Sequence, residues 1–170
     1  MAYALGLFVH VVSAMALFVG LGIEGSTLYR GRRGGGGAGG ESGNGLRWAQ
    51  RFGGPGLGLA ILAGLYLAGT EWGWREPWID VALGGVVLVG AVWGRMTGAR
   101  LARLQREGGA VPLTDPVLWR SLTTRAGLLV GIVFLMTVKP GWAVSLVGLG
   151  IGLAAGVLAG RPSSPRRSVA

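Results

Sequence analysis

Two side chains in the first apolar segment of the chain could do chemistry inside a membrane. They are His10, which is the one histidine of the sequence, and Glu24. Ionisable groups in an apolar span are costly, and they are candidates for function by default. The two residues are fourteen positions apart, close to four helical turns, so they share one helix face but lie ~21 Å apart along it. We therefore expect two separate sites.

Two interpretations of His10 are open. Its imidazole could form a hydrogen bond with a hydroxyl or carbonyl group of a neighbouring helix. Alternatively it could ligate haem b or a metal ion, with Met136 as a second soft ligand and Lys139 beside the haem propionates. A zinc or hydrolytic site would need more ligands than the sequence provides. We predict no catalytic residue and no metal-binding cluster.

Glu24 has a structural interpretation. Arg95, in the third apolar segment, is expected at a similar depth in the membrane. Charged groups within membrane helices usually face the bundle interior and pair with one another. We therefore predict an ion pair between Glu24 and Arg95 that holds two helices together.

Long apolar runs must carry these residues. The composition is 51% hydrophobic and 14% charged, with a mean hydropathy of +0.54, whereas about 25% of a soluble domain is charged. A membrane helix needs ~20 mostly apolar residues. Five segments meet this requirement: 3–29, 52–70, 78–96, 116–138 and 142–160. The sequence predicts an all-α fold, a polytopic bundle of five transmembrane helices that forms a single domain over residues 1–170.

Local signals set the limits of some segments. Asp115 followed by Pro116 is typical of a helix start, and the run Lys139-Pro140-Gly141 should end the same helix. Residues 34–45 contain eight glycines in twelve positions. Such a composition cannot repay its ordering entropy, so it predicts a flexible linker between the first two spans.

Charge predicts the orientation of the bundle. Of the 16 basic residues, 14 fall in three regions, 30–51, 95–125 and 161–167, which five spans place on one side. Basic residues in short loops favour the cytoplasmic side, so the N-terminus is expected outside and the C-terminus inside. Most Trp and Tyr residues fall at the two predicted membrane boundaries, which supports the same limits. We expect a multi-pass protein of the plasma membrane, with the lipid bilayer rather than nucleic acid as the partner of its basic residues.

One face of the fifth segment is made of glycines at every fourth position: Gly148, Gly152, Gly156 and Gly160. The third segment has a similar series, Gly90, Gly94 and Gly98. Small residues let membrane helices approach closely. These faces are expected to pack against other helices, either within the chain or, for the fifth segment, in a homo-oligomer or against a membrane partner.

The run from His10 to Gly20, HVVSAMALFVG, resembles the first helix of a broad bacterial group. The copper-resistance-D-like and HemJ-like group includes the membrane domain of copper-resistance protein D, HemJ-type protoporphyrinogen oxidase and uncharacterised predicted integral membrane proteins. Residues 134–140, FLMTVKP, look most like the uncharacterised branch. The resemblance implies a bacterial membrane protein with haem or copper chemistry at His10, and Lys139 as a match to a membrane lysine of the group.

Three functions follow from these observations. The first is a non-enzymatic integral membrane protein, such as an accessory subunit, whose features serve packing and topology. The second is a haem- or metal-binding redox protein that uses His10. The third is a small-solute transporter, which would need paired repeats or broken helices around a polar site at the membrane midplane.

Overall fold

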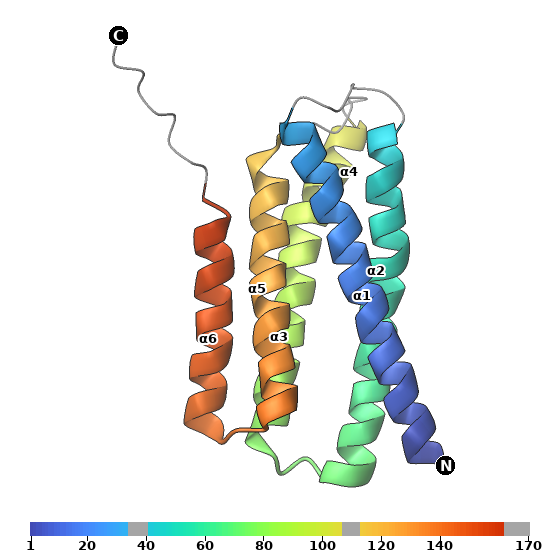
Figure 1. Ribbon diagram of the computed structural model, residues 1–170, viewed down its shortest axis with the longest axis vertical. Helices are drawn as coiled ribbons and strands as arrows, with labels where there is room; N and C mark the ends of the chain where they lie inside the picture. The colour runs from blue at the N-terminus through green and yellow to red at the C-terminus, as the bar shows by residue number, and fades with distance from the viewer. Residues whose placement is uncertain (34–40, 107–112, 162–170) are drawn as a thin grey trace.

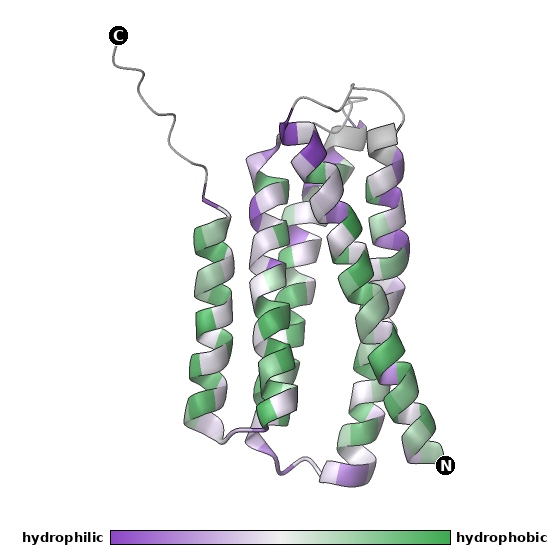
Figure 2. Ribbon diagram, in the orientation of Figure 1, coloured by the Kyte–Doolittle hydropathy of each residue, from purple (hydrophilic) through white to green (hydrophobic). Residues whose placement is uncertain are grey.

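The computed structural model of the chain describes residues 1–33, 41–106 and 113–161. All regular secondary structure in these residues is helical, and five helices are long and apolar enough to cross a membrane. Each helix runs antiparallel to the next membrane-length helix along the chain (Figure 1). Apolar residues cover the middle of the helices, and polar residues gather toward their ends (Figure 2). The prediction of an all-α bundle with five apolar helices is confirmed.

The long helices are α1 (Ala2–Arg32), α2 (Glu41–Leu67), α3 (Pro77–Val92), α5 (Pro116–Val138) and α6 (Trp142–Ala159). Two π-helical turns, η1 (Ala68–Trp72) and η2 (Trp93–Gly98), extend α2 and α3. The short helix α4 (Ala99–Arg106) continues η2, so the third span ends in a basic extension.

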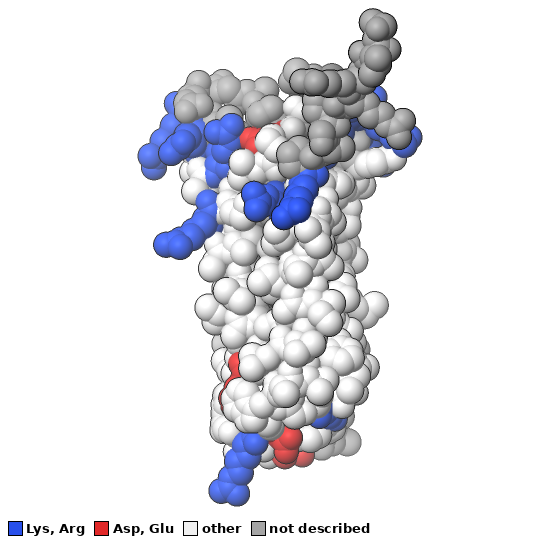
Figure 3. All heavy atoms as spheres, turned by 90° about the vertical axis from the view of Figure 1, so that its left-hand side faces the viewer, with Lys and Arg blue, Asp and Glu red and all other residues white. Residues whose placement is uncertain are grey.

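The bundle has two ends of different charge. At the end where α1 and α6 terminate and α2 and α5 begin, Lys and Arg residues gather on the visible surface (Figure 3). We call this the basic end. The N-terminus and the connections 73–76 and 139–141 lie at the opposite end, which we call the far end (Figure 1).

The limits of α5 follow from its terminal residues. Val117 donates its backbone N–H to Asp115 Oδ1 at 2.8 Å, so the aspartate satisfies one of the free donors at the helix start. Arg100 Nε also lies 2.7 Å from Asp115 Oδ2. Lys139 has the left-handed conformation, with φ 51°, that commonly terminates a helix. Both signals were readable in the sequence.

The linker prediction for residues 34–45 is wrong in its second part, because α2 already begins at Glu41. Residues 34–40 lie outside the described residues. The first turns of α2 are amphipathic: Leu46 and Ala49 are buried, whereas Arg47 and Gln50 are exposed. One apolar face is enough to hold these turns on the bundle, although their average hydropathy is too low to mark them as part of a span.

The glycine face of α6 packs against α5. A Cβ atom at Gly156 would lie 2.9 Å from Thr124 Cα, and one at Gly160 would lie 3.0 Å from Arg120 Cα. At Gly152 the added atom would collide with the backbone of Gly127. The two helices are therefore in backbone contact, and no larger residue fits at these positions.

The glycine series of the third span, Gly90, Gly94 and Gly98, does not pack against another helix as expected. A Cβ atom at Gly90 or Gly94 would meet nothing within 4 Å among the described residues. The approach of α3 to its neighbours uses Gly85, where an added Cβ would lie 3.1 Å from side-chain atoms of Ile132 and Leu149. The face that contains Gly85 also carries the buried residues Ala82 and Val89, so this face of α3 is the one that turns inward.

Two matched substitutions in α6 test the backbone contact. Gly152→Leu should lower the melting temperature of the purified protein strongly, because overpacking costs about 1–3 kcal/mol. Gly150→Leu should have little effect, since nothing lies within 4 Å of a Cβ at that position. Equal melting temperatures for the two variants would contradict the packing of α6 on α5.

Candidate functional site

The bundle consists of two closely packed halves. One half is α1 with α2, and the other is α3 with α5 and α6. In the first half, a Cβ at Gly20 would lie 2.8 Å from Ala49 O, and a Cβ at Gly56 would lie 2.9 Å from Leu17 N. The backbones of α1 and α2 are therefore in contact, as are those of α5 and α6. The contacts between the halves are fewer, and they decide the shape of the site.

A buried ion pair joins the halves toward the basic end. Glu24 Oε1 of α1 lies 2.5 Å from Arg125 Nη2 of α5, and the two residues are only 6% and 3% exposed. Arg125 Nε also donates to Ser121 O at 3.2 Å. The guanidinium lies over the Trp93 ring, 5.2 Å from its centre. These contacts surround two charges that would otherwise be costly in an apolar interior.

The predicted partner of Glu24 is therefore wrong, because the carboxylate pairs with Arg125 and not with Arg95. Arg95 is exposed, whereas Trp93, two positions earlier in η2, lies against Arg125. Residues two apart on a helix point to different faces. Since the indole of Trp93 takes the face turned toward the ion pair, Arg95 is directed away from it.

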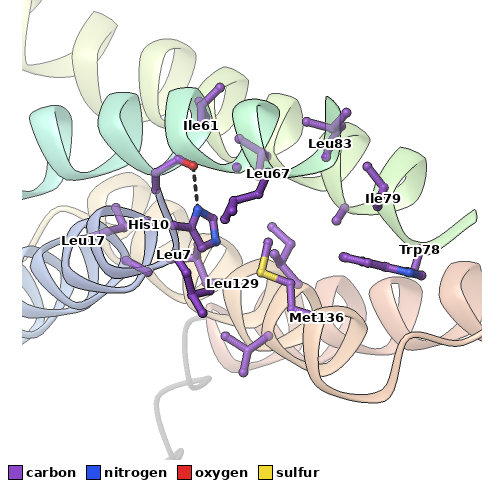
Figure 4. A pocket seen from close by; sticks show the side chains of 18 of the residues that line it. Leu7, His10, Leu17, Ile61, Leu67, Trp78, Ile79, Leu83, Leu129 and Met136 are labelled. Atoms are coloured by element: carbon purple, nitrogen blue, oxygen red, sulfur yellow. Dashed lines mark hydrogen bonds between the residues drawn. The ribbon is translucent and has the colours of Figure 1, made fainter. Parts of the chain in front are cut away.

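An apolar cavity of about 280 Å³ lies between the halves (Figure 4). Residues from α1, α2, α3 and α5 line it, together with η1 and Lys139. On α1 the lining residues recur every three or four positions from Tyr3 to Leu17, and Phe18 follows directly. At ~1.5 Å per residue this stretch of α1 extends for about 22 Å. The lining therefore runs parallel to the helices, and we call the cavity the slot.

The slot opens between α1 and α5. Leu7 and Phe18 of α1 and Val133 and Met136 of α5 line it, and all four are themselves exposed. These residues lie in the apolar stretches of their helices. The opening therefore lies on the apolar outer surface of the bundle.

His10 holds its position by one ring nitrogen and leaves the other free for the slot. Its Nδ1 lies 2.9 Å from the carbonyl oxygen of Ala60 on α2. Because a carbonyl only accepts hydrogen bonds, Nδ1 must carry the proton, and in the neutral ring Nε2 keeps its lone pair. Figure 4 shows the second nitrogen turned into the slot, on the side where Met136 lies. A Cβ at Gly64 would lie 3.2 Å from His10 Cε1, so this glycine makes room for the ring.

The structure brings the three residues of the predicted haem site around one cavity. His10, Met136 and Lys139 all line the slot. Lys139 is at the far end, where its Nζ lies 4.1 Å from the centre of the Trp72 ring and 6.0 Å from that of Trp78. In the described part of the chain Lys139 forms no ion pair. Its ammonium group lies against these aromatic faces, while the residue as a whole is exposed.

Sequence reasoning missed the roles of Trp72 and Trp78, which it assigned only to the membrane boundary. Both line the slot, and they pack edge to face with ring centres 5.5 Å apart. Trp78 is 8% exposed, and among the described residues its Nε1–H is the buried side-chain donor that lacks a hydrogen-bond partner. Arg125 was also missed, although its place nine residues inside a predicted span was a signal.

No group of three or more His, Cys, Asp or Glu residues that could hold a metal ion occurs in the described ranges. Compared with protein-family models, curated proteins and solved structures, the chain matches none of them. The slot offers the imidazole of His10, the thioether of Met136, the ammonium group of Lys139 and the phenol of Tyr3 around a mostly apolar space.

The ion pair yields a prediction about stability. Glu24→Gln should destabilise the protein by roughly 3–5 kcal/mol, because it leaves the Arg125 charge buried without a partner. Adding Arg125→Gln should recover part of this loss. Arg95→Gln is the control, and it should leave the melting temperature unchanged because Arg95 is exposed. If Arg95→Gln destabilised the protein as much as Glu24→Gln, the assigned pair would be wrong.

Proposed function

We propose that the chain is a non-enzymatic, multi-pass membrane protein that binds an apolar ligand in the slot between its two halves. The observation that carries the proposal is a mostly apolar slot into which the second ring nitrogen of His10 is turned. Binding sites for small molecules are typically apolar cavities with a few placed polar groups. The slot has this character.

The position of the opening supports access from the bilayer. The exposed lining residues belong to α1 and α5, at depths where both helices are apolar. An apolar ligand dissolved in the membrane would reach the slot sideways without crossing water. Toward the basic end the lining of the slot stops at Leu17, Phe18 and Leu129, short of Glu24 and Arg125.

Haem is the second candidate, and the donors around the slot support it. A histidine that donates Nδ1–H to a carbonyl and presents Nε2 is a common arrangement for a metal ligand. Met136 would supply a thioether, and Lys139 could pair with a propionate. The slot has a volume of about 280 Å³, which is below the ~300–1,000 Å³ of drug-sized sites. Because haem is a bulky ligand, we rank it second. A Soret band in protein expressed with haem, removed by His10→Ala, would reverse this order.

The proposed orientation places the N-terminus outside and the basic end in the cytoplasm. The support is the concentration of basic residues at one end of the bundle, as in Figure 3. With this orientation the slot lies in the outer half of the membrane, and Lys139 lies at the outer surface.

Photo-crosslinking tests ligand binding. A fatty alcohol with a diazirine on its chain, added to the protein in lipid nanodiscs, should label buried slot residues such as Leu67 and Ile132. Ile61→Trp should abolish this labelling by filling the slot, which Ile61 lines. The matched control is Leu62→Trp, since Leu62 is 66% exposed and does not line the slot. Labelling spread evenly over the apolar surface, or unchanged in Ile61→Trp, would refute the proposal.

Cysteine labelling tests the orientation, and the absence of native cysteine makes single-cysteine variants unambiguous. In intact cells an impermeant maleimide should react with Arg75→Cys at the far end and not with Asn44→Cys at the basic end. Both native side chains are exposed. Reaction with Asn44→Cys alone would show the opposite orientation.

A further inference from the structure

Lys139 is an unusual residue at its position. It terminates α5 in the left-handed conformation, with φ 51° and ψ 52°. Glycine is favoured there because any Cβ is strained, and such strain is found where a side chain has a function. The adjacent residues Pro140 and Gly141 already end the helix. A lysine at this position is therefore better explained by its side chain than by the backbone turn.

Among the described residues that line the slot, Lys139 is the one Lys, Arg, Asp or Glu. Three carboxylates, those of Glu71, Glu76 and Asp80, lie in the neighbouring elements at the far end, but none lines the slot. In the part of the chain that the structure describes, none of them forms an ion pair with Lys139. The ammonium group therefore remains available for a negative group at the far end of the slot.

Trp78 provides a second, independent observation at the same place. Its ring lies 6.0 Å from Lys139 Nζ, and its Nε1–H is buried without an acceptor among the described residues. A buried donor without a partner is destabilising. An oxygen-bearing group beside Lys139 would relieve this donor only if the indole shifted, because the buried nitrogen does not face the open space of the slot.

We propose that the ligand of the slot is a single-chain amphiphile with one acidic headgroup, which pairs with Lys139 while its apolar chain runs toward His10. This inference rests on the proposed function and specifies the chemistry of its ligand. The slot has a volume of about 280 Å³ and a lining that extends ~22 Å along α1, which suits one extended chain rather than a diacyl lipid. The chain enters between α1 and α5, and the headgroup stays at the surface where the two tryptophans lie.

The test compares two photoactivatable probes of equal chain length in nanodiscs of neutral lipid: the diazirine fatty alcohol and the corresponding fatty acid. The acid should label slot residues about fivefold more than the alcohol at equal concentration, as expected for one partly exposed ion pair. Lys139→Gln should remove this preference but keep the labelling by the alcohol. Lys139→Arg should retain the preference. Arg75→Gln is the control, because Arg75 is exposed at the same end and does not line the slot.

The outcomes separate this inference from the proposed function. Equal labelling by acid and alcohol, both blocked by Ile61→Trp, would overturn the acidic headgroup and leave the apolar ligand standing. Loss of the preference in Arg75→Gln to the same degree as in Lys139→Gln would also overturn it, because the effect would then be one of general surface charge. Failure of both probes to label the slot would overturn the proposed function itself. Competition with unlabelled palmitate or lysophosphatidate would show whether the acidic group is a carboxylate or a phosphate.

Discussion

A carboxylate and a guanidinium that are buried among apolar helices are stable only as an ion pair. Glu24 and Arg125 form such a pair across the two halves of the bundle. Breaking such a pair leaves an uncompensated charge, which costs far more than a surface pair is worth. The pair therefore fixes α1 against α5 near the basic end. Trp93 and the Thr97–Ser121 hydrogen bond of 2.8 Å pack around it from η2 and α5.

The slot follows from this constraint together with the glycine contacts. Within each half, glycines bring backbones together, so α1 stays with α2 and α5 stays with α6. Between the halves the ion pair supplies a close contact toward one end, whereas toward the other end the facing side chains leave the slot open. In lipid there is no hydrophobic driving force that would bring apolar helices together and close such a gap. An apolar ligand can fill it and recover the dispersion contacts that the gap forgoes.

The sequence alone was sufficient for the spans, because length and hydropathy decide which segments can cross a membrane. It was also sufficient for the limits of α5, where Asp115 and Lys139 act through local backbone geometry. It was insufficient for the start of α2, where one buried face outweighs a polar average. It also failed for the partner of Glu24, since that depends on the helical phase at η2, which a non-local packing of Trp93 sets.

The candidate site was partly predictable for a related reason. Helical spacing was enough to place His10 and Met136 at similar depth, where both line the slot, although Met136 is itself exposed. The slot could not be predicted, because a cavity forms where several helices fail to pack closely. No single segment of the sequence indicates such a place. The unpartnered Trp78 donor and the aromatic contacts of Lys139 depend on η1, a π-helical turn for which the sequence offered no signal.

Native mass spectrometry of the protein released from membranes of the producing cells tests the central claim most directly. If the slot holds a ligand, the wild-type chain and Leu62→Trp should each carry one single-chain adduct of defined mass. Ile61→Trp should carry none, because the indole occupies the slot. Wild-type protein without an adduct, or the same adduct on Ile61→Trp, would contradict the account and leave the space between the two halves as a packing defect.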